Sequence, residues 1–545
     1  MKMRTLYFVF SSLLLQKAKC YVNQPQHELT TDDEVVYSPM MHEFYDSRNT
    51  EFYSNFTEYN TFEKDLKFEN FSLIIQSMEE EKEESEEDGD TDEFEVYNEY
   101  EGDLEKEDED SKEDGETLEN NYDNDDDDDN NNNDDENDDE NKYSDEDKKT
   151  STAQFFNYRT QKVNGVNLGG WLVTEPFITP SLYEGASPDG TETETPIDEY
   201  NFCKVLGPYE AHQRLKEHWD TFITEADIAK IKSYGFNAVR LPIGYWAFAR
   251  LSDDPYVFGQ EEYLVKAIQW CRSYGLKLWI DLHGIPGSQN GFDNSGRRDV
   301  FEWMYVRKNY DLGIQVLQYI FDKYTGPMYD DVIIGYENLN EPLHNRYEAS
   351  RILEFDQQTY KMFREKSSNH FVFHDAFLPV DYWHKTFDEP EYYDTVLDHH
   401  RYEVFDTTQL REGIDGHITS VRLLTEKFLS VPRVQIVGEW SAALTDCAKW
   451  LNGVGRRARM DNTFAGDGFI AECRYSNDYS KMTREDRINT RRLIEAQLDI
   501  YNQTNGFFFW TWKTENAVEW SMSTLADIGL FPVPLTERLY PKIVN

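Results

Sequence analysis

From about residue 156 onward, short apolar or aromatic runs alternate with amphipathic stretches, and this alternation repeats eight times. The runs predict strands at 163–171, 236–243, 277–283, 332–340, 371–376, 395–402, 434–440 and 507–512. Helix-like stretches lie between them, the clearer ones at 221–234, 261–274, 349–367 and 484–503, and the sixth connection, 403–433, has the weakest pattern. Strands and helices in regular order predict parallel strands joined by crossovers, so we expect a (β/α)8 TIM barrel over 156–545.

The chain before the barrel has a different composition. Residues 21–155 are polar and acidic, and between 79 and 148 there are 39 Asp or Glu against 5 Lys, which accounts for most of the formal net charge of −52. Such a stretch has too little apolar surface to offset its ordering entropy, so we expect a disordered acidic arm. A calcium-buffering arm is the alternative, but no twelve-residue calcium-binding loop appears in it.

Residues 1–20 are typical of a secretory signal peptide. Lys2 and Arg4 precede an apolar run at 6–15, which ends near the small residues Ala18 and Cys20. The run is too short to span a bilayer as a helix, so we expect no stable membrane insertion. Glycosylation sequons at Asn55, Asn70 and Asn502 fit a secreted product, located outside the cell or in a cell wall.

Removal of the signal peptide would leave four cysteines, which a secreted protein is free to oxidise. Cys271 falls in line with Leu264 on one face of a predicted helix and is expected as a buried thiol. Cys447 and Cys473 lie in a loop-rich stretch and are the favoured disulfide pair, which would stabilise the fold by roughly 3 kcal/mol. The pairing of Cys203 and Cys271 stays open.

Polar or aromatic side chains end most of the predicted strands. They are Arg240, His283, Asn340 with Glu341, His400 with Tyr402, Glu439, and Trp510 with Trp512. Catalytic groups of such barrels lie at the C-terminal ends of the strands. One charged strand end is common, but so many in register indicate an active site.

Two of these strand ends carry glutamates. Glu341 lies in Asn340-Glu341-Pro342 at the end of the fourth strand, and Glu439 follows Gly438 at the end of the seventh. Cleavage of a glycosidic bond with retention needs two carboxyl groups about 5 to 5.5 Å apart, one as acid and one as nucleophile. Two strands that open on the same end of the barrel can supply them, which predicts a glycoside hydrolase.

Longer motifs surround these residues. They are VNLGGWLVTEPFITPSLYE from Val163, VRLPIGYWAF from Val239, DLHGIPGSQNGFDNSG from Asp281, LNEPL from Leu339, DHHRYEVF from Asp398, VGEWSAALTDCAKWLNG from Val437 and WTWKTE from Trp510. With these motifs the chain resembles, over about 160–540, the fungal exo-β-1,3-glucanases of glycoside hydrolase family five. The resemblance implies that Glu341 is the acid/base and Glu439 the nucleophile.

The resemblance also implies the supporting roles. Asn340 would hydrogen-bond the sugar 2-hydroxyl, Arg240 and Tyr402 would bracket Glu439, and His283 and His400 would orient the sugar and the carboxylates. The deepest glucose would be held by Glu175, Asp293, Asn294 and Arg456, with Trp510 as its stacking floor and Phe292 and Phe405 as an aromatic pair at the mouth. Trp510 and Trp512 alternate on a strand, so only one of them can face the barrel.

Structural explanations compete with some of these roles. Arg240 could be an ordinary salt-bridge partner, His283 and His400 structural histidines, and Phe292 and Phe405 core residues. The doublet His399-His400 could suggest a metal, but no third ligand stands at a familiar spacing, so neither a metal nor a cofactor is predicted.

The chain departs from the family pattern at a few positions. His399-His400-Arg401 stands where the family has three histidines, and Phe177 stands where it has a tyrosine. A second cysteine pair that many relatives carry is missing, and the acidic arm has no counterpart.

These observations predict a secreted, monomeric, retaining exo-β-1,3-glucanase that releases glucose from non-reducing ends of cell-wall β-glucan, with transglycosylation as a further activity and no nucleic-acid partner. A β-1,6-glucanase or β-glucosidase of the same fold is the alternative enzyme. The alternative from another class is a wall-binding protein that has lost its activity, although the two glutamates argue against it.

Overall fold

The computed structural model describes residues 35–48, 155–464 and 468–540. The predicted signal peptide, the acidic stretch 79–148 and the sequons at Asn55 and Asn70 lie outside the described residues.

Eight parallel strands form the predicted barrel. They are β2 (Val163–Asn167), β3 (Ala238–Gly244), β5 (Lys277–Gly284), β6 (Ile333–Glu337), β7 (Phe371–His374), β8 (Thr395–Arg401), β9 (Val434–Trp440) and β10 (Gly506–Phe509). The sheet closes in the order β10-β2-β3-β5-β6-β7-β8-β9, so β10 pairs with both β9 and β2. The (β/α)8 fold is confirmed.

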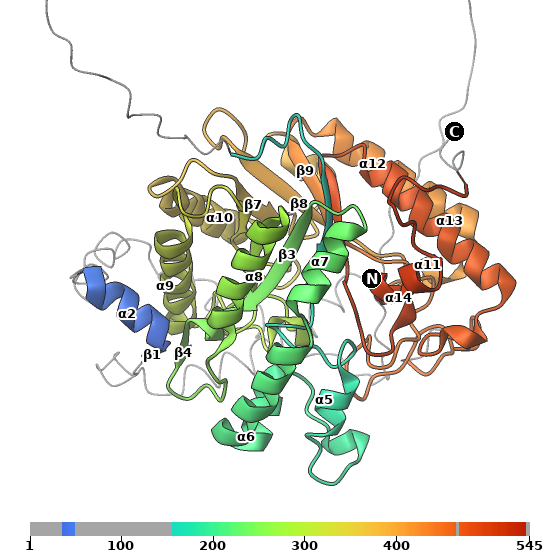
Figure 1. Ribbon diagram of the computed structural model, residues 1–545, viewed down its shortest axis with the longest axis horizontal. Helices are drawn as coiled ribbons and strands as arrows, with labels where there is room; N and C mark the ends of the chain where they lie inside the picture. The colour runs from blue at the N-terminus through green and yellow to red at the C-terminus, as the bar shows by residue number, and fades with distance from the viewer. Residues whose placement is uncertain (1–34, 49–154, 465–467, 541–545) are drawn as a thin grey trace, which may run out of the picture. The chain divides into compact units, whose positions relative to one another are not determined.

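Helices surround the strands (Figure 1). Those of the barrel region are α5 (Pro180–Glu184), α6 (Glu199–Thr221), α7 (Glu225–Ser233), α8 (Gln260–Tyr274), α9 (Arg307–Tyr324), α10 (Ala349–Arg364), α11 (Thr407–Arg411), α12 (Ile414–Ser430), α13 (Arg484–Tyr501) and α14 (Met522–Asp527). The connection 403–433, whose pattern was weak, contains α11 and α12. Among the described helices, none has both the length and the apolar composition needed to cross a membrane.

Several strands are shorter than their apolar runs. The run 332–340 gives only β6, because the chain leaves the ladder after Glu337 and reaches Glu341 with a φ of 47°. A positive φ is unfavourable for a residue with a Cβ and is found mostly where function requires it. Glu341 therefore lies in the loop that follows β6 and not in the strand itself.

The amino-terminal ends of the strands are closed by aromatic packing. Phe156 and Tyr158 precede β2 and join a buried cluster that includes Trp279 and Phe508. The Tyr158 hydroxyl donates a hydrogen bond to the carbonyl of Ile334 over 2.9 Å. Since this end is filled, chemistry is confined to the opposite end.

The expectation of a disordered arm over 21–155 is wrong for residues 35–48. These residues form β1 (Val35–Tyr37) and α2 (Pro39–Arg48), and β1 pairs antiparallel with β4 (Ala249–Leu251) on the flank of the barrel. Backbone pairing and a few buried side chains hold them there, and neither leaves a periodic pattern in so short a segment.

The structure joins Cys447 to Cys473, the pair favoured by the sequence, with a Cα separation of 5.4 Å. Cys203 and Cys271 are both buried free thiols. Burial raises the pKa of Cys271 to about 12, so this thiol stays protonated and unreactive.

Candidate active site

Three strands of the barrel, β6, β8 and β9, bring the two glutamates together. Glu439 lies on β9 and is paired in register with His400 of β8, while Glu341 follows β6. The Nδ1 atom of His400 lies 2.8 Å from Oε1 of Glu341 and 3.4 Å from Oε2 of Glu439. All three side chains are buried or nearly so.

The shared contact with His400 limits how far apart the carboxylates can be. The two oxygens cannot be separated by more than the sum of these distances, 6.2 Å. Inverting glycosidases hold their carboxyl groups about 6.5 to 9.5 Å apart to admit a water, and retaining ones about 5 to 5.5 Å apart. The spacing of Glu341 and Glu439 therefore suits double displacement.

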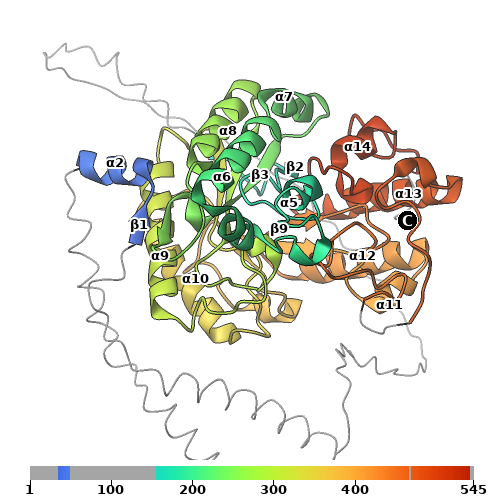
Figure 2. The same ribbon diagram turned by 90° about the horizontal axis from the view of Figure 1, so that it is seen from below.

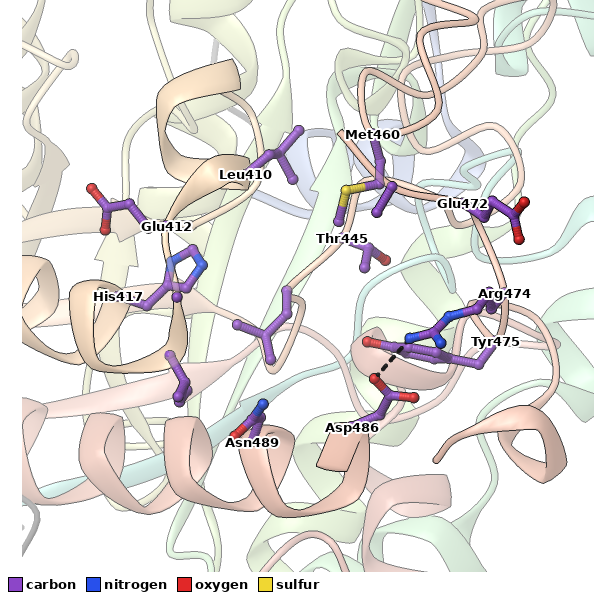
Figure 3. A pocket seen from close by; sticks show the side chains of 14 residues that line it. Leu410, Glu412, His417, Thr445, Met460, Glu472, Arg474, Tyr475, Asp486 and Asn489 are labelled. Atoms are coloured by element: carbon purple, nitrogen blue, oxygen red, sulfur yellow. Dashed lines mark hydrogen bonds and ion pairs between the residues drawn. The ribbon is translucent and has the colours of Figure 1, made fainter. Parts of the chain in front are cut away.

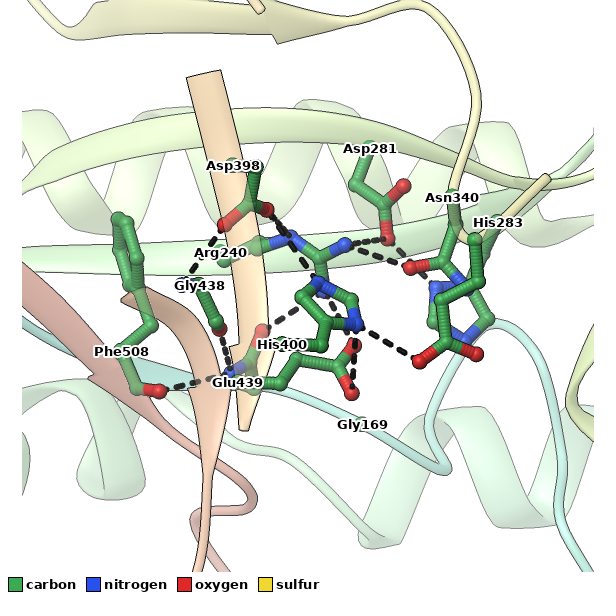
Figure 4. Close-up of polar contacts among 12 residues, drawn as sticks. Gly169, Arg240, Asp281, His283, Asn340, Asp398, His400, Gly438, Glu439 and Phe508 are labelled. Atoms are coloured by element: carbon green, nitrogen blue, oxygen red, sulfur yellow. Dashed lines mark hydrogen bonds and ion pairs between the residues drawn. The ribbon is translucent and has the colours of Figure 1, made fainter. Parts of the chain in front are cut away.

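Arg240 of β3 lies in a polar network with Glu439, Asn340 and Asp281 (Figure 4). Its guanidinium donates hydrogen bonds of 2.8 Å to Glu439, to Asn340 and to Glu337. Asp281 lies 3.2 Å from the same group. A fully buried arginine among several carboxylates keeps its charge, so it is more than a simple salt-bridge partner.

Tyr402 provides the second donor to Glu439. Its hydroxyl donates to Oε2 over 2.7 Å. Burial, and then the charge of Glu439, raise the pKa of Tyr402 well above its ordinary value, so the phenol stays protonated and remains a donor. Arg240 and Tyr402 thus hold the two oxygens of one carboxylate.

Protons are unequally shared between Glu341 and His400. Burial alone would raise the pKa of Glu341, but the hydrogen bond and charge of His400 lower it to about 2. Burial disfavours the charged imidazole, yet the charges of Glu439 and Asp398 raise the pKa of His400 well above its usual range. The directions of these two pKa shifts favour the proton of this pair on His400, 2.8 Å from Glu341 Oε1.

The pKa of Glu439 is shifted upward, opposite to that of Glu341. Burial raises its pKa, and the charges of His400 and Arg240 oppose that rise. Removing the hydroxyl of Tyr402, or the charge of Arg240 or His400, should raise the pKa of Glu439 further.

Among the described residues that the family resemblance assigns to sugar binding, four have a buried polar atom without a hydrogen-bond partner. They are Glu175 Oε1, His283 Nε2, Asp293 Oδ2 and Asn340 Nδ2. Buried polar atoms normally have partners, so unpaired ones that surround a reactive centre indicate a polar ligand. Asn294 is nearby and donates from Nδ2 to Glu341 Oε2 over 3.1 Å.

The two tryptophans after β10 face different sides. Trp510 stacks on His283 with ring centroids 5.5 Å apart, and a Cβ on Gly169 would meet its ring at 2.7 Å. Trp512 donates from its indole nitrogen to Asp227 of α7 over 2.9 Å. Trp510 is therefore the ring at the reactive end.

Phe292 and Phe405 are both 42% exposed and so are not core residues. Phe405 lies against Tyr402, with centroids 5.5 Å apart. Phe177, the departure from the family tyrosine, packs edge-on against Trp520. Arg456 is less central than the sequence suggests, since its half-exposed side chain pairs with Asp299 over 2.9 Å.

The histidine doublet does not form a ligand pair. His399 bonds Asp375 at 2.7 Å and Gln435 at 2.9 Å, on the far side of the strand from His400. The groups that could surround an ion, Glu341, His374 and His400, belong to the carboxylate network itself.

Four buried polar residues of the network were not found from the sequence. They are Asn167, Asp281, Glu337 and Asp398. Asp281 and Asp398 stand two positions before His283 and His400, and side chains two apart on a strand share a face. That spacing could have found these two, and Asp398 does bond His400 Nε2 at 3.3 Å.

A pocket that neither Glu341 nor Glu439 lines is formed by residues of α11, α12 and α13 and of the chain between 444 and 475 (Figure 3). Its wall contains the ion pair of Arg474 with Asp486, at 3.3 Å. None of the site residues predicted from the sequence lines it.

Comparison with known proteins agrees with this geometry. Residues 197–461 match the family model of cellulase, glycosyl hydrolase family 5. A glucan 1,3-beta-glucosidase of Pichia angusta is 46% identical over 394 residues, covering 71% of this chain and 89% of the relative. A sporulation-specific glucan 1,3-beta-glucosidase of Saccharomyces cerevisiae is 44% identical over 392 residues, covering 70% and 88%.

Among solved structures, rutinosidase from Aspergillus niger shares the fold, with a TM-score of 0.55, 21% identity, and coverage of 69% of this chain and 99% of the other. The matched sequences and the barrel with its paired glutamates lead to the same assignment. The chain belongs to glycosyl hydrolase family 5 and, within it, to the group of the fungal glucan 1,3-beta-glucosidases.

Proposed function

We propose that the protein is a retaining exo-β-1,3-glucanase that removes glucose from the non-reducing ends of β-1,3-glucan. The spacing of Glu341 and Glu439 around His400 carries this proposal, because it suits double displacement. The names and the identity of the fungal relatives support the linkage.

In the first step Glu439 is the nucleophile. One of its oxygens attacks the anomeric carbon while the bond from that carbon to the leaving oxygen breaks, and a covalent glucosyl ester forms. Arg240 and Tyr402 keep the carboxylate ionised and aimed. His400 passes a proton to Glu341 across their 2.8 Å contact, and Glu341 gives this proton to the leaving oxygen.

In the second step Glu341 acts as a base. It removes a proton from a water molecule, whose oxygen attacks the anomeric carbon and releases Glu439 as a carboxylate. Glucose leaves with its original configuration. A sugar hydroxyl in place of the water would give transglycosylation by the same route.

The unpaired polar atoms account for sugar recognition. The amide nitrogen of Asn340 is free to donate to the sugar 2-hydroxyl, because its oxygen already accepts from Arg240. Glu175, His283 and Asp293 offer further atoms to hydroxyls, and Trp510 offers a ring face. Phe292 and Phe405 would hold the next glucose units.

Parallel digestion of β-1,3- and β-1,6-glucan, with sizing of the products and NMR of the released anomer, tests this function. We expect β-glucose alone from the β-1,3-glucan. Oligosaccharides would indicate an endo-acting enzyme, α-glucose an inverting one, and preference for β-1,6-glucan the alternative linkage. No product from either glucan would indicate the wall-binding alternative.

We also propose that the protein is secreted and acts outside the cell or in the cell wall. Residues 1–20 resemble a signal peptide, and an enzyme for cell-wall glucan must reach the wall. Sequencing the N-terminus of the protein from culture medium and from the wall fraction would test secretion, and we expect residues 1–20 to be absent from both.

A further inference from the structure

A strand and a helix from the N-terminal part of the chain lie on the flank of the barrel, away from the site described above. Figures 1 and 2 both show β1 and α2 beside α9. β1 pairs with β4, Val36 opposite Arg250, and the Ser38 backbone N–H donates to the carbonyl of Phe248 over 2.7 Å. Among the described strands, β4 pairs only with β1, which therefore covers an edge that would otherwise be open.

Apolar and aromatic side chains of α2 pack in the same contact. Met41 is 1% exposed. The ring centroids of Phe44 and Tyr45 lie 5.4 and 5.8 Å from that of Tyr319 on α9. Tyr319 also packs against Phe248, with centroids 5.7 Å apart, so the helix extends an aromatic cluster of the barrel.

Polar contacts fix the register of this segment. Glu261 of α8 is 2% exposed and accepts hydrogen bonds from Tyr319 and Lys323 of α9. Ser38 Oγ donates to the other oxygen of Glu261 over 3.2 Å and accepts from the backbone N–H of Met41 over 3.1 Å. One hydroxyl thus caps the start of α2 and completes the partners of a buried carboxylate.

We propose that residues 35–48 are a docking segment that binds this flank of the barrel as a peptide ligand would, by adding a strand and inserting apolar side chains. Its partner is the surface formed by β4, the start of α8 and α9. The docking segment keeps the N-terminal part of the chain attached to the enzyme when the chain is cut between 49 and 154.

The docking affects what happens when the chain that connects the docking segment to the barrel is cut. The acidic stretch 79–148 connects the docking segment to Phe155, where the described chain resumes. Every contact named above is non-covalent and lies between 35–48 and the barrel, so a cut in the connection breaks none of them. The acidic residues are attached to the barrel at both ends, and one cleavage does not release them.

The test is a cleavage experiment on the full chain. A recognition sequence for a specific protease is inserted after residue 100, and an affinity tag is placed at the C-terminus. After complete cleavage, the barrel is captured by its tag and the N-terminal fragment is quantified by mass spectrometry. We expect the fragment to be captured with the barrel in near-equal amounts, and a fragment found only in the unbound fraction would overturn the proposal.

Variants confined to the docking segment leave the barrel unchanged. Met41→Asp places a charge in the buried contact and should lower the captured fraction at least tenfold. Ser47→Asp adds the same charge to an exposed position of the same helix and should leave capture unchanged. Equal capture of the Met41→Asp fragment would show that another part of the fragment makes the contact, which would also contradict the proposal.

Hydrogen exchange gives a second readout in the uncut chain. Met41→Asp should speed amide exchange at 249–251, since β4 loses its partner strand, while exchange in β8 and β9 stays the same. Hydrolytic activity is not measured in either experiment, so failure here is distinct from failure of the proposed function.

Discussion

The hydroxyl of Tyr402 donates a hydrogen bond to Oε2 of Glu439 over 2.7 Å, and the phenol is held protonated by its surroundings. Burial raises the pKa of Glu439. A hydrogen bond to the charged form of a carboxylate favours that form, so this donor should act against the rise. Tyr402 therefore helps to keep Glu439, the proposed nucleophile, ionised.

Tyr402→Phe removes that donor and leaves the ring. Since hydrolysis needs ionised Glu439, the acidic limb of the pH profile of kcat/KM should move up by about one pH unit. At the optimum, kcat/KM should fall roughly tenfold or more, the value of a hydrogen bond to a charged group. Tyr209→Phe, at a position 74% exposed, should leave the profile unchanged. A lower rate with an unmoved acidic limb would rule out this electrostatic role.

The two glutamates can be assigned by azide rescue. Glu439→Ala opens a space on one face of the anomeric carbon, where azide can attack an activated β-glucoside and give an α-glucosyl azide. Glu341→Ala still forms the covalent intermediate with good leaving groups, and azide from the opposite face gives a β-glucosyl azide. On natural glucan Glu341→Ala should lose ~100 to 10,000-fold in rate, the usual contribution of a general acid.

Glu354→Ala, an exposed position on α10, is the matched control for both and should retain normal turnover. Exchanged stereochemistry of the azides would reverse the assignment of Glu341 and Glu439.

The exposed rings of Phe292 and Phe405 should matter for chain length. Replacing both by Ala removes two stacking contacts, each of about 1 kcal/mol. We expect kcat/KM for a β-1,3-linked oligosaccharide to fall by more than tenfold, and that for a small aryl glucoside to change little. If both substrates lose equally, the rings support the fold and do not bind the distal sugar units.

Stability should depend on pH through Asp356, a buried residue of α10. Burial raises its pKa from the ordinary 3.8 to about 8, although Asn338 donates a hydrogen bond to it. The folded state therefore holds a proton that the unfolded chain has lost, so the free energy of unfolding should fall as the pH rises from about 4 to 8.

Asp356→Asn stays uncharged and should flatten this dependence. Each pKa unit corresponds to about 1.4 kcal/mol, so the effect should be plain in urea titrations at pH 5 and pH 8. The exposed Asp381→Asn should preserve the wild-type slope. An equal slope for Asp356→Asn would mean that other buried acids, such as Glu199, control the dependence.

Barrel topology explains why so much of the site could be predicted. Once eight strands alternate with helices, every strand end faces one opening, so residues as distant in sequence as Arg240 and Glu439 must lie close together. The barrel topology does not determine the conformation of the loops in the same way. Nothing in the sequence placed Arg456 beside Asp299, because that contact depends on the conformation of two connections.

The docking segment was missed for a different reason. A three-residue strand such as β1 is too short to show alternation, and its stability comes from the edge of β4 and from Tyr319, hundreds of residues away. The pattern of apolar residues in a segment indicates which of its own side chains can be buried. It does not indicate that a short strand such as β1 pairs with another short strand such as β4.

Gly438 has a consequence for how the catalytic end can vary. Its backbone N–H donates to Asp398 over 2.7 Å, and a Cβ at this position would lie 2.1 Å from that carboxylate. Even alanine must therefore displace Asp398, the residue that bonds His400 beneath both glutamates. A single methyl group beside Glu439 would therefore disturb the proposed supply of protons from His400 to Glu341. We therefore expect substitutions that alter substrate preference to be tolerated at Phe292 and Phe405, and not at Gly438.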